Sequence, residues 1–125
     1  MQDSTTMSRT DSPNRLIASN RVEGTAVYNR AGEKLGRVEY FMVDKQSGKA
    51  DYAVMSFGGL FGLGEDHYPL PWDVLDYDAD QGGYIVDLDK EKLTGGPRYR
   101  ANETPEYDRT YGQQVYGYYG IAYPW

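Results

Sequence analysis

The residues that could do acid-base or metal chemistry surround the only histidine. His67 follows two carboxylates, Glu65 and Asp66. A histidine beside acids could hold a metal ion or form an acid-base pair. Three consecutive residues rarely converge on one ion, so a surface turn is the expected structure. No serine, threonine or lysine has a base at the spacing of a known nucleophile motif, so the sequence predicts neither an enzyme nor a cofactor.

An acidic segment further along the chain approximates a calcium-binding loop. Its candidate ligands are Asp76, Asp78, Asp80 and Asp87. Carboxylates at alternate positions suit calcium, but Gln81 stands where the sharp turn needs a glycine. The twelfth position is also an aspartate, which reaches less far than the usual glutamate. Calcium or small-ligand binding by a regulatory domain is therefore the alternative hypothesis.

The third candidate is a glycine-rich segment at residues 58–64. Its four glycines allow unusual backbone angles, while Leu60, Phe61 and Leu63 still favour burial. Phosphate-binding loops place lysine and a hydroxyl residue where this chain has Glu65 and Asp66, and two carboxylates repel a phosphate. The segment therefore predicts a structured loop whose apolar side chains contact a partner.

Composition excludes several classes of protein. The chain has 125 residues, a formal net charge of −6 and no cysteine. Its length fits one domain, and its charge opposes the phosphate contacts that dominate nucleic-acid binding. Without cysteine there is neither a disulfide framework nor a thiolate metal site. No apolar stretch is long enough to span a bilayer and none resembles a signal peptide, so we expect a soluble protein in the cytoplasm.

The elements that position these residues are short strands. Apolar runs rich in valine, tyrosine and methionine alternate with glycine and aspartate turns, which is typical of a small barrel or sandwich. The expected strands are residues 25–28, 36–44, 50–57, 67–72, 72–78 and 83–87. We expect residues 36–44 to be central and to pair antiparallel with 50–57, and the proline-containing strand to lie at an edge or bend. Residues 89–93 predict one helical turn capped by Asp89.

The two ends of the chain differ in composition. Residues 1–14 are polar and predict a disordered tail. Residues 98–125 are rich in tyrosine and glycine, and this extension either wraps its own domain or contacts another chain. The candidate contacts in it are Tyr116, Tyr118, Tyr119 and Trp125.

Several short motifs in order resemble the PRC-barrel family. Residues 26–38 read AVYNRAGEKLGRV, and they are followed by Val43-Asp44, by the YAVMS run at 52–56 and by Leu70-Pro71-Trp72. The resemblance covers roughly Leu16 to Leu93. It implies a domain at residues 15–97 with a fold like the cytoplasmic domain of the photosynthetic reaction centre H subunit and the C-terminal domain of a ribosome maturation factor. Both of these uses are protein-binding ones. The resemblance also suggests a stand-alone bacterial member, a group that supplies no activity to carry over.

Together these observations predict an all-β protein, a small PRC-type β-barrel with one short helical turn and an aromatic C-terminal tail. The leading hypothesis is a non-enzymatic adaptor that binds an unidentified protein or forms a homodimer through its apolar loop and aromatic tail. No nucleic-acid partner and no transmembrane segment are expected.

Overall fold

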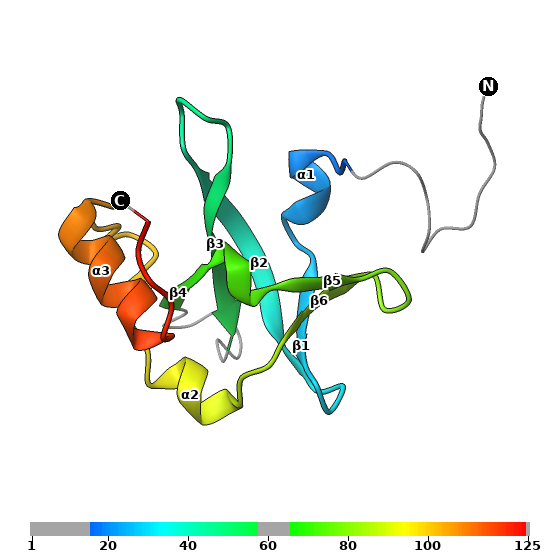
Figure 1. Ribbon diagram of the computed structural model, residues 1–125. Helices are drawn as coiled ribbons and strands as arrows, with labels where there is room; N and C mark the ends of the chain where they lie inside the picture. Colours follow the sequence, from blue (N-terminus) through cyan, green and yellow to red (C-terminus); the bar gives the residue numbers. More distant parts are fainter. Residues whose placement is uncertain (1–15, 58–65, 125) are drawn as a thin grey trace, which may run out of the picture.

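One seven-stranded sheet organises the chain in the computed structural model, which describes residues 16–57 and 66–124. The strands are β1 (Ala26–Asn29), β2 (Lys34–Val43), β3 (Ala50–Phe57), β4 (Asp66–Pro71), β5 (Asp76–Asp78), β6 (Gly83–Val86) and β7 (Tyr99–Arg100). Their order across the sheet is β5-β6-β1-β2-β3-β4-β7 (Figure 1). Within the described residues no ladder joins β5 to β7, so a closed barrel stays a prediction.

β2 is the central strand, as its sequence indicates. It pairs antiparallel with β1 on one side and with β3 on the other. A shift in register between Val38 and Tyr40 breaks the simple alternation of its side chains. Val38 is fully buried in the main core, whereas Tyr40 reaches Tyr99 on β7. Both faces of β2 are therefore covered along its middle, as predicted.

The prolines of β4 lie where a strand can carry them. Pro69 and Pro71 pair with Val54 and Tyr52 of β3. On the other side, β7 pairs only with Asp66 and His67. The prolines therefore occupy the part of β4 whose outer edge has no described strand partner, where no ladder hydrogen bond is lost.

The predicted strand at residues 72–78 is wrong in its first half. Trp72–Val74 form a 3₁₀ turn, η2, closed by a hydrogen bond from the Leu75 N–H to the Trp72 carbonyl at 3.1 Å. The chain has to turn there, because β4 and β5 lie towards opposite ends of the sheet. β5 then pairs with β6 in the expected hairpin, and β6 pairs parallel to β1.

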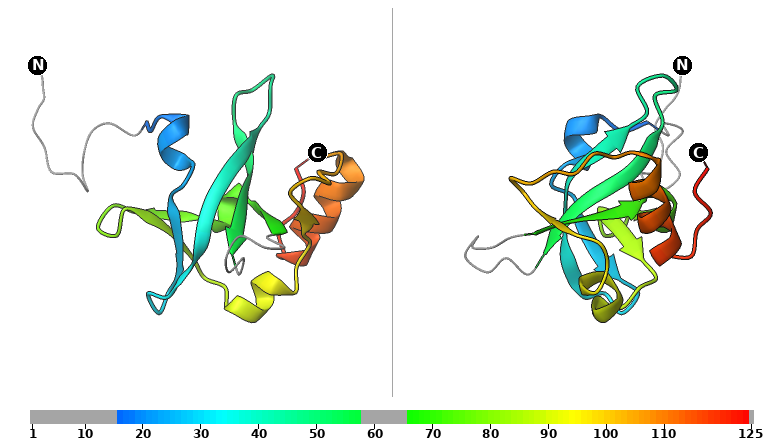
Figure 2. Two further views of the ribbon diagram at one scale, coloured as in Figure 1. Left: turned by 180° about the vertical axis from the view of Figure 1, so that it is seen from behind. Right: turned by 90° about the vertical axis from the view of Figure 1, so that its left-hand side faces the viewer.

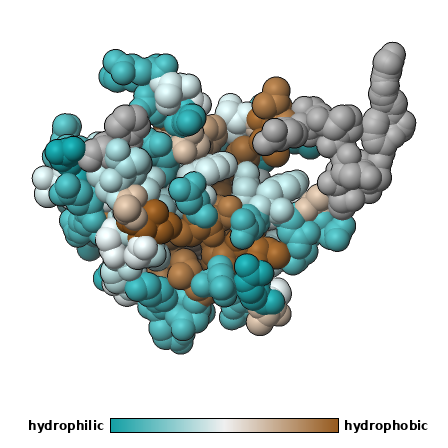
Figure 3. Space-filling model, in the orientation of Figure 1, coloured by the Kyte–Doolittle hydropathy of each residue, from teal (hydrophilic) through white to brown (hydrophobic). Residues whose placement is uncertain are grey.

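The main hydrophobic core lies on one face of the sheet. Its fully buried members include Val27, Val38, Met55, Leu70 and Leu93. On β3 the alternation of side chains places Ala53 and Met55 in this core. Figure 3 shows apolar side chains gathered along the centre of one face of the molecule, with hydrophilic ones around them.

A C-terminal helix covers the opposite face. The helices are α1 (Ser19–Val22), α2 (Lys90–Thr94) and α3 (Arg109–Tyr118). α3 lies beside β4 in both views of Figure 2 and contacts it. Val115 and Tyr116 of α3 form a second buried cluster with Tyr52 of β3. Of the two alternatives for residues 98–125, the described part of the extension therefore wraps its own domain, and it adds β7 to the sheet.

An aspartate caps the N-terminus of both α2 and α3, and a glycine follows the end of α3. Asp89 caps α2 as predicted, accepting a hydrogen bond from the Lys92 N–H at 2.7 Å. Asp108 caps α3 in the same way through the Tyr111 N–H at 2.9 Å. α3 ends at Tyr118, and the φ of 73° at Gly120 beyond it allows the Ile121 N–H to reach back to the Tyr116 carbonyl at 2.9 Å.

None of the helices in residues 16–57 and 66–124 combines the length and the apolar character needed to cross a bilayer.

Candidate functional site

A pocket opens between the β2–β3 hairpin and the C-terminal extension. Its volume is about 610 Å³, which lies within the usual range for ligand sites. Residues from the hairpin and residues from the extension line it together: Met42, Val43, Asp44, Lys45, Gln46, Asp51, Tyr52, Tyr107 and Tyr123. The pocket therefore exists only because the extension folds back onto the sheet.

The hairpin wall is held by its own turn. Asp44 accepts hydrogen bonds from the N–H groups of Gln46 at 2.8 Å and Ser47 at 3.0 Å. These bonds lower the pKa of Asp44 and keep its carboxylate charged. Gly48 closes the turn with a φ of 79°, which favours glycine. The turn thus presents a fixed negative charge at the rim of the pocket.

Tyrosine rings form the floor and the far wall. Tyr52 is 4% exposed, and its ring centroid lies 4.9 Å from that of Tyr107 and 5.5 Å from that of Tyr116. Tyr123 packs against Tyr116 at 5.1 Å. All these pairs meet edge to face, the arrangement that the quadrupoles of aromatic rings favour.

The hydroxyl of Tyr52 is the unusual group in the pocket lining. It is buried and has no hydrogen-bond partner. Burial raises the pKa of Tyr52 well above its ordinary value, and the proximity of Tyr123 adds to the shift. An unsatisfied buried hydroxyl costs free energy, and because the oxygen of Tyr52 is itself buried, it is not exposed to the open space of the pocket.

Hydrogen-bonded tyrosine hydroxyl groups hold Tyr107 in place in the pocket wall. The hydroxyl oxygen of Tyr99 lies 2.7 Å from those of Tyr40 and Tyr107. Burial raises the pKa of Tyr99 and of Tyr107. These contacts join β2, β7 and the extension, so they fix the position of Tyr107 beside the pocket.

His67 lies in this layer and not on a surface turn, so that prediction is wrong. It belongs to β4, is 9% exposed and has a buried Nδ1 without a partner. The rings of Tyr40 and Tyr99 each lie 5.7 Å from its ring, edge to face. Strand pairing buries His67, whereas the acidic residues before it in the sequence indicated an exposed turn.

Glu39 lies on the same side of the sheet. It accepts a hydrogen bond from the Ser56 hydroxyl and forms an ion pair with Arg37 at 3.0 Å. Burial pushes the pKa of Glu39 upward, but these hydrogen bonds outweigh it and the net pKa is lowered. The carboxylate is therefore a structural partner of Ser56 and Arg37.

The tail residues predicted as partner contacts have different surroundings. Tyr116 is 4% exposed, and its hydroxyl donates a hydrogen bond to the Asp51 carbonyl at 2.7 Å, so its assignment as a partner contact is wrong. Tyr118 is half-buried and donates to the Lys92 carbonyl at 2.7 Å. Tyr119 packs against both buried clusters. The predicted contacts Leu60, Phe61, Leu63 and Trp125 lie outside the described residues.

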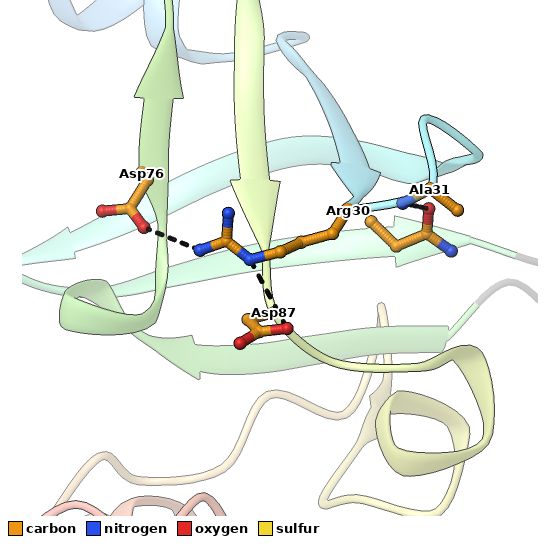
Figure 4. A network of polar contacts seen from close by, with 5 residues as sticks. Arg30, Ala31, Asp76 and Asp87 are labelled. Carbon is orange, nitrogen blue, oxygen red and sulfur yellow. Dashed lines mark hydrogen bonds and ion pairs between the residues drawn. The ribbon is translucent and has the colours of Figure 1, made fainter.

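The four aspartates of the predicted calcium loop do not form a cation site. Arg30 forms ion pairs with Asp76 at 4.0 Å and with Asp87 at 3.5 Å, and its guanidinium lies between the two carboxylates (Figure 4). Asp78 instead accepts a hydrogen bond from the Asp80 N–H at 2.9 Å. Within the described ranges no group of three metal-ligating side chains comes together. The guanidinium of Arg30 already pairs with two of the aspartates, so the calcium interpretation is not supported.

Reasoning from sequence missed Tyr52, Tyr107 and Tyr123 as site residues. The abundance of tyrosine was visible, with 13 in the chain. What was not visible was which of them meet, because the hairpin and the extension are distant in sequence and come together only in the folded chain.

Comparison with known proteins places this architecture in a family. The model of the PRC-barrel domain matches residues 15–93. The chain therefore belongs to the PRC-barrel domain family, as the sequence motifs predict. The pocket walls formed by Tyr107 and Tyr123 lie beyond the matched residues.

Two known proteins are similar to parts of the chain. An uncharacterized protein of Deinococcus radiodurans is 30% identical over 80 residues, which are 64% of this chain and 28% of that protein. The crystal structure of a putative 16S ribosomal RNA processing protein RimM from Pseudomonas aeruginosa matches with 20% identity and a TM-score of 0.40. That match covers 68% of this chain and 50% of the other. The chain thus spans half or less of the relatives it matches.

Proposed function

We propose that the chain is a non-enzymatic binding module that takes a protein partner in the pocket between the β2–β3 hairpin and the C-terminal extension. The observation that carries the proposal is a pocket of about 610 Å³ whose lining brings Asp51 and Tyr52 of the sheet together with Tyr107 and Tyr123 of the extension. Membership of the PRC-barrel family supports a binding role without naming a partner. A shared fold does not transfer a function.

The composition of the pocket also favours recognition over catalysis. It is lined by aromatic rings, two carboxylates and one lysine, and by no histidine. Aromatic residues tend to dominate the binding energy of interfaces. The partly exposed rings of Tyr107 and Tyr123 would serve as the anchors.

Affinity capture with matched variants tests the proposal. The intact chain, Asp51→Lys and Asp80→Lys are immobilised and exposed to lysate of the organism that encodes the chain. Asp80 is exposed on the β5–β6 turn, so its variant reverses one charge away from the pocket. We expect the same proteins on the intact chain and on Asp80→Lys, and their loss from Asp51→Lys.

Capture that is equal on all three samples would show that the pocket is not the binding surface. Light scattering on the eluted complexes distinguishes a different protein from a second copy of the chain. A dimer that Asp51→Lys dissociates would make the partner a second copy.

A further inference from the structure

The chemistry of the pocket identifies the group that it accepts. We propose that it binds the cationic end of an arginine or lysine side chain presented by a basic segment of the partner protein. This inference rests on the proposed function, because it assigns a ligand class to the same pocket. Three independent features of the lining support it.

The first feature is the aromatic lining. Tyr107 and Tyr123 of the extension are partly exposed and line one space together with Tyr52 of β3. A cation over the face of a tyrosine is attracted by the quadrupole of the ring. The chain uses this interaction elsewhere, because the Lys92 Nζ lies 4.0 Å from the ring centroid of Tyr118.

The second feature is negative charge. Asp44 and Asp51 both line the pocket, and the chain carries a net charge of −6. Asp44 stays ionised because the backbone bonds of its turn lower its pKa. Within the described residues the side chain of Asp51 enters no ion pair, so its carboxylate is available to an incoming cation.

One residue of the lining opposes a cation. Lys45 is exposed at the hairpin turn and offsets one of the two carboxylates. Its ammonium sits on a flexible stem in water, so its repulsion is screened more strongly than the attraction of groups within the pocket. Removing this charge should therefore tighten binding, so a Lys45 variant should change the affinity in the opposite direction to an Asp51 variant.

The third feature is size. The volume of about 610 Å³ leaves room for a whole basic side chain with its flanking backbone. Size, negative charge and aromatic lining thus agree on one ligand class.

Titration of the intact chain with matched peptides tests the proposal. The probe is the peptide acetyl-Gly-Arg-Gly-Arg-Gly-amide, and its control carries citrulline, the uncharged isostere, in place of arginine. Binding is followed by amide chemical shifts in nuclear magnetic resonance spectra. We expect shifts at the hairpin and around Tyr107 and Tyr123, and binding of the citrulline peptide at least about tenfold weaker.

Variants identify the groups that act. Asp51→Asn should weaken the arginine peptide about fivefold or more, Lys45→Gln should strengthen it, and Asp80→Asn should leave it unchanged. Tyr52→Phe should leave it unchanged, because the Tyr52 hydroxyl is buried.

Each other outcome overturns a stated part of the proposal. Recognition of a cation is refuted if the two peptides bind equally, if neither binds, or if Asp51→Asn has no effect on binding. In each of these cases partner capture can still support the binding module. Tetramethylammonium chloride binding as tightly as the arginine peptide would assign the pocket to a free small cation. If the pocket variants also leave partner capture unchanged, the proposed function fails as well.

Discussion

At the scale of single residues, Tyr52 and Tyr116 differ in one respect that matters. Both are 4% exposed and their rings touch edge to face at 5.5 Å. The Tyr116 hydroxyl donates a hydrogen bond to the Asp51 carbonyl at 2.7 Å, whereas the Tyr52 hydroxyl has no partner. A buried polar group stabilises the fold only when it is satisfied. The pair therefore separates a satisfied buried hydroxyl from an unsatisfied one.

Removing the two hydroxyl groups should have different effects on stability. We expect Tyr116→Phe to lower the free energy of unfolding by roughly 1 kcal/mol, because it breaks a hydrogen bond and leaves a carbonyl unpaired. Tyr52→Phe should leave it unchanged or raise it slightly, since the lost group was unsatisfied. Urea denaturation of both variants measures the difference. Equal losses would mean that Tyr52 has a partner in solution.

At the scale of elements, the β2–β3 hairpin and α3 make the pocket together. The sequence of α3 does not predict a helix, because glycine and tyrosine are poor helix formers. Its caps and its packing against Tyr52 compensate for that composition. Gly112 has a further role, since the ring of Tyr123 rests on it and a Cβ there would lie 2.2 Å from Tyr123 Cζ. A small residue in the helix thus allows the chain end to fold back over it.

Two glycines of α3 provide a matched test of this packing. Gly112→Ala should displace Tyr123 and destabilise the protein by about 1–3 kcal/mol, the usual range for overpacking. Gly117→Ala meets nothing within 4 Å and should stabilise the helix by up to about 1 kcal/mol. Thermal unfolding gives the order of stability, and near-ultraviolet circular dichroism reports the displaced ring. The packing of Tyr123 on α3 would be contradicted if both variants gained stability.

At the scale of the whole molecule, the extension converts a single-core sheet into a structure with two buried layers. The main core is largely aliphatic, whereas the second layer is built mainly from tyrosine. Lys92 ties the layers together, because its Nζ donates to the Tyr118 carbonyl at 3.0 Å while α2 contributes Leu93 to the main core. Loosening the extension would therefore remove both the second layer and the pocket.

The buried tyrosines make stability depend on alkaline pH. Burial raises the pKa of Tyr111 and of Tyr116 to about 12, and it also raises the pKa of Tyr52, Tyr99 and Tyr107. An unfolded tyrosine ionises near pH 10, so above that pH the unfolded state loses protons that the folded state keeps. The contribution of these tyrosines to stability should be constant below pH 10 and fall between pH 10 and 12, by up to about 1.4 kcal/mol per pH unit per group, less where solvent screens it.

Denaturation at pH 9 and pH 11, with absorbance at 295 nm to count ionised tyrosines, checks this expectation. Tyr107→Phe should show a smaller loss between the two pH values than the intact chain, because one buried phenol is gone. Equal stability of the intact chain at both pH values would contradict burial of the second layer.

Much of the sheet followed from the sequence alone. The alternation of apolar residues, the glycine and aspartate turns and the family motifs predicted the central β2, the β2–β3 hairpin, the proline-bearing β4 and the Asp89 cap. These features depend on neighbours within a few residues, where propensity and capping chemistry act. The mostly β character and the PRC-barrel family were therefore determined locally.

The tertiary structure decided what the side chains do. His67 and Tyr116 are buried, Arg30 occupies the position expected for calcium, and Tyr107 and Tyr123 reach a hairpin about sixty to eighty residues earlier in the chain. No local pattern records such contacts, because they depend on how α3 docks against β4 and on which hydroxyl groups find partners there. Burial and long-range packing are properties of the folded whole, so the pocket could be located only in the structure.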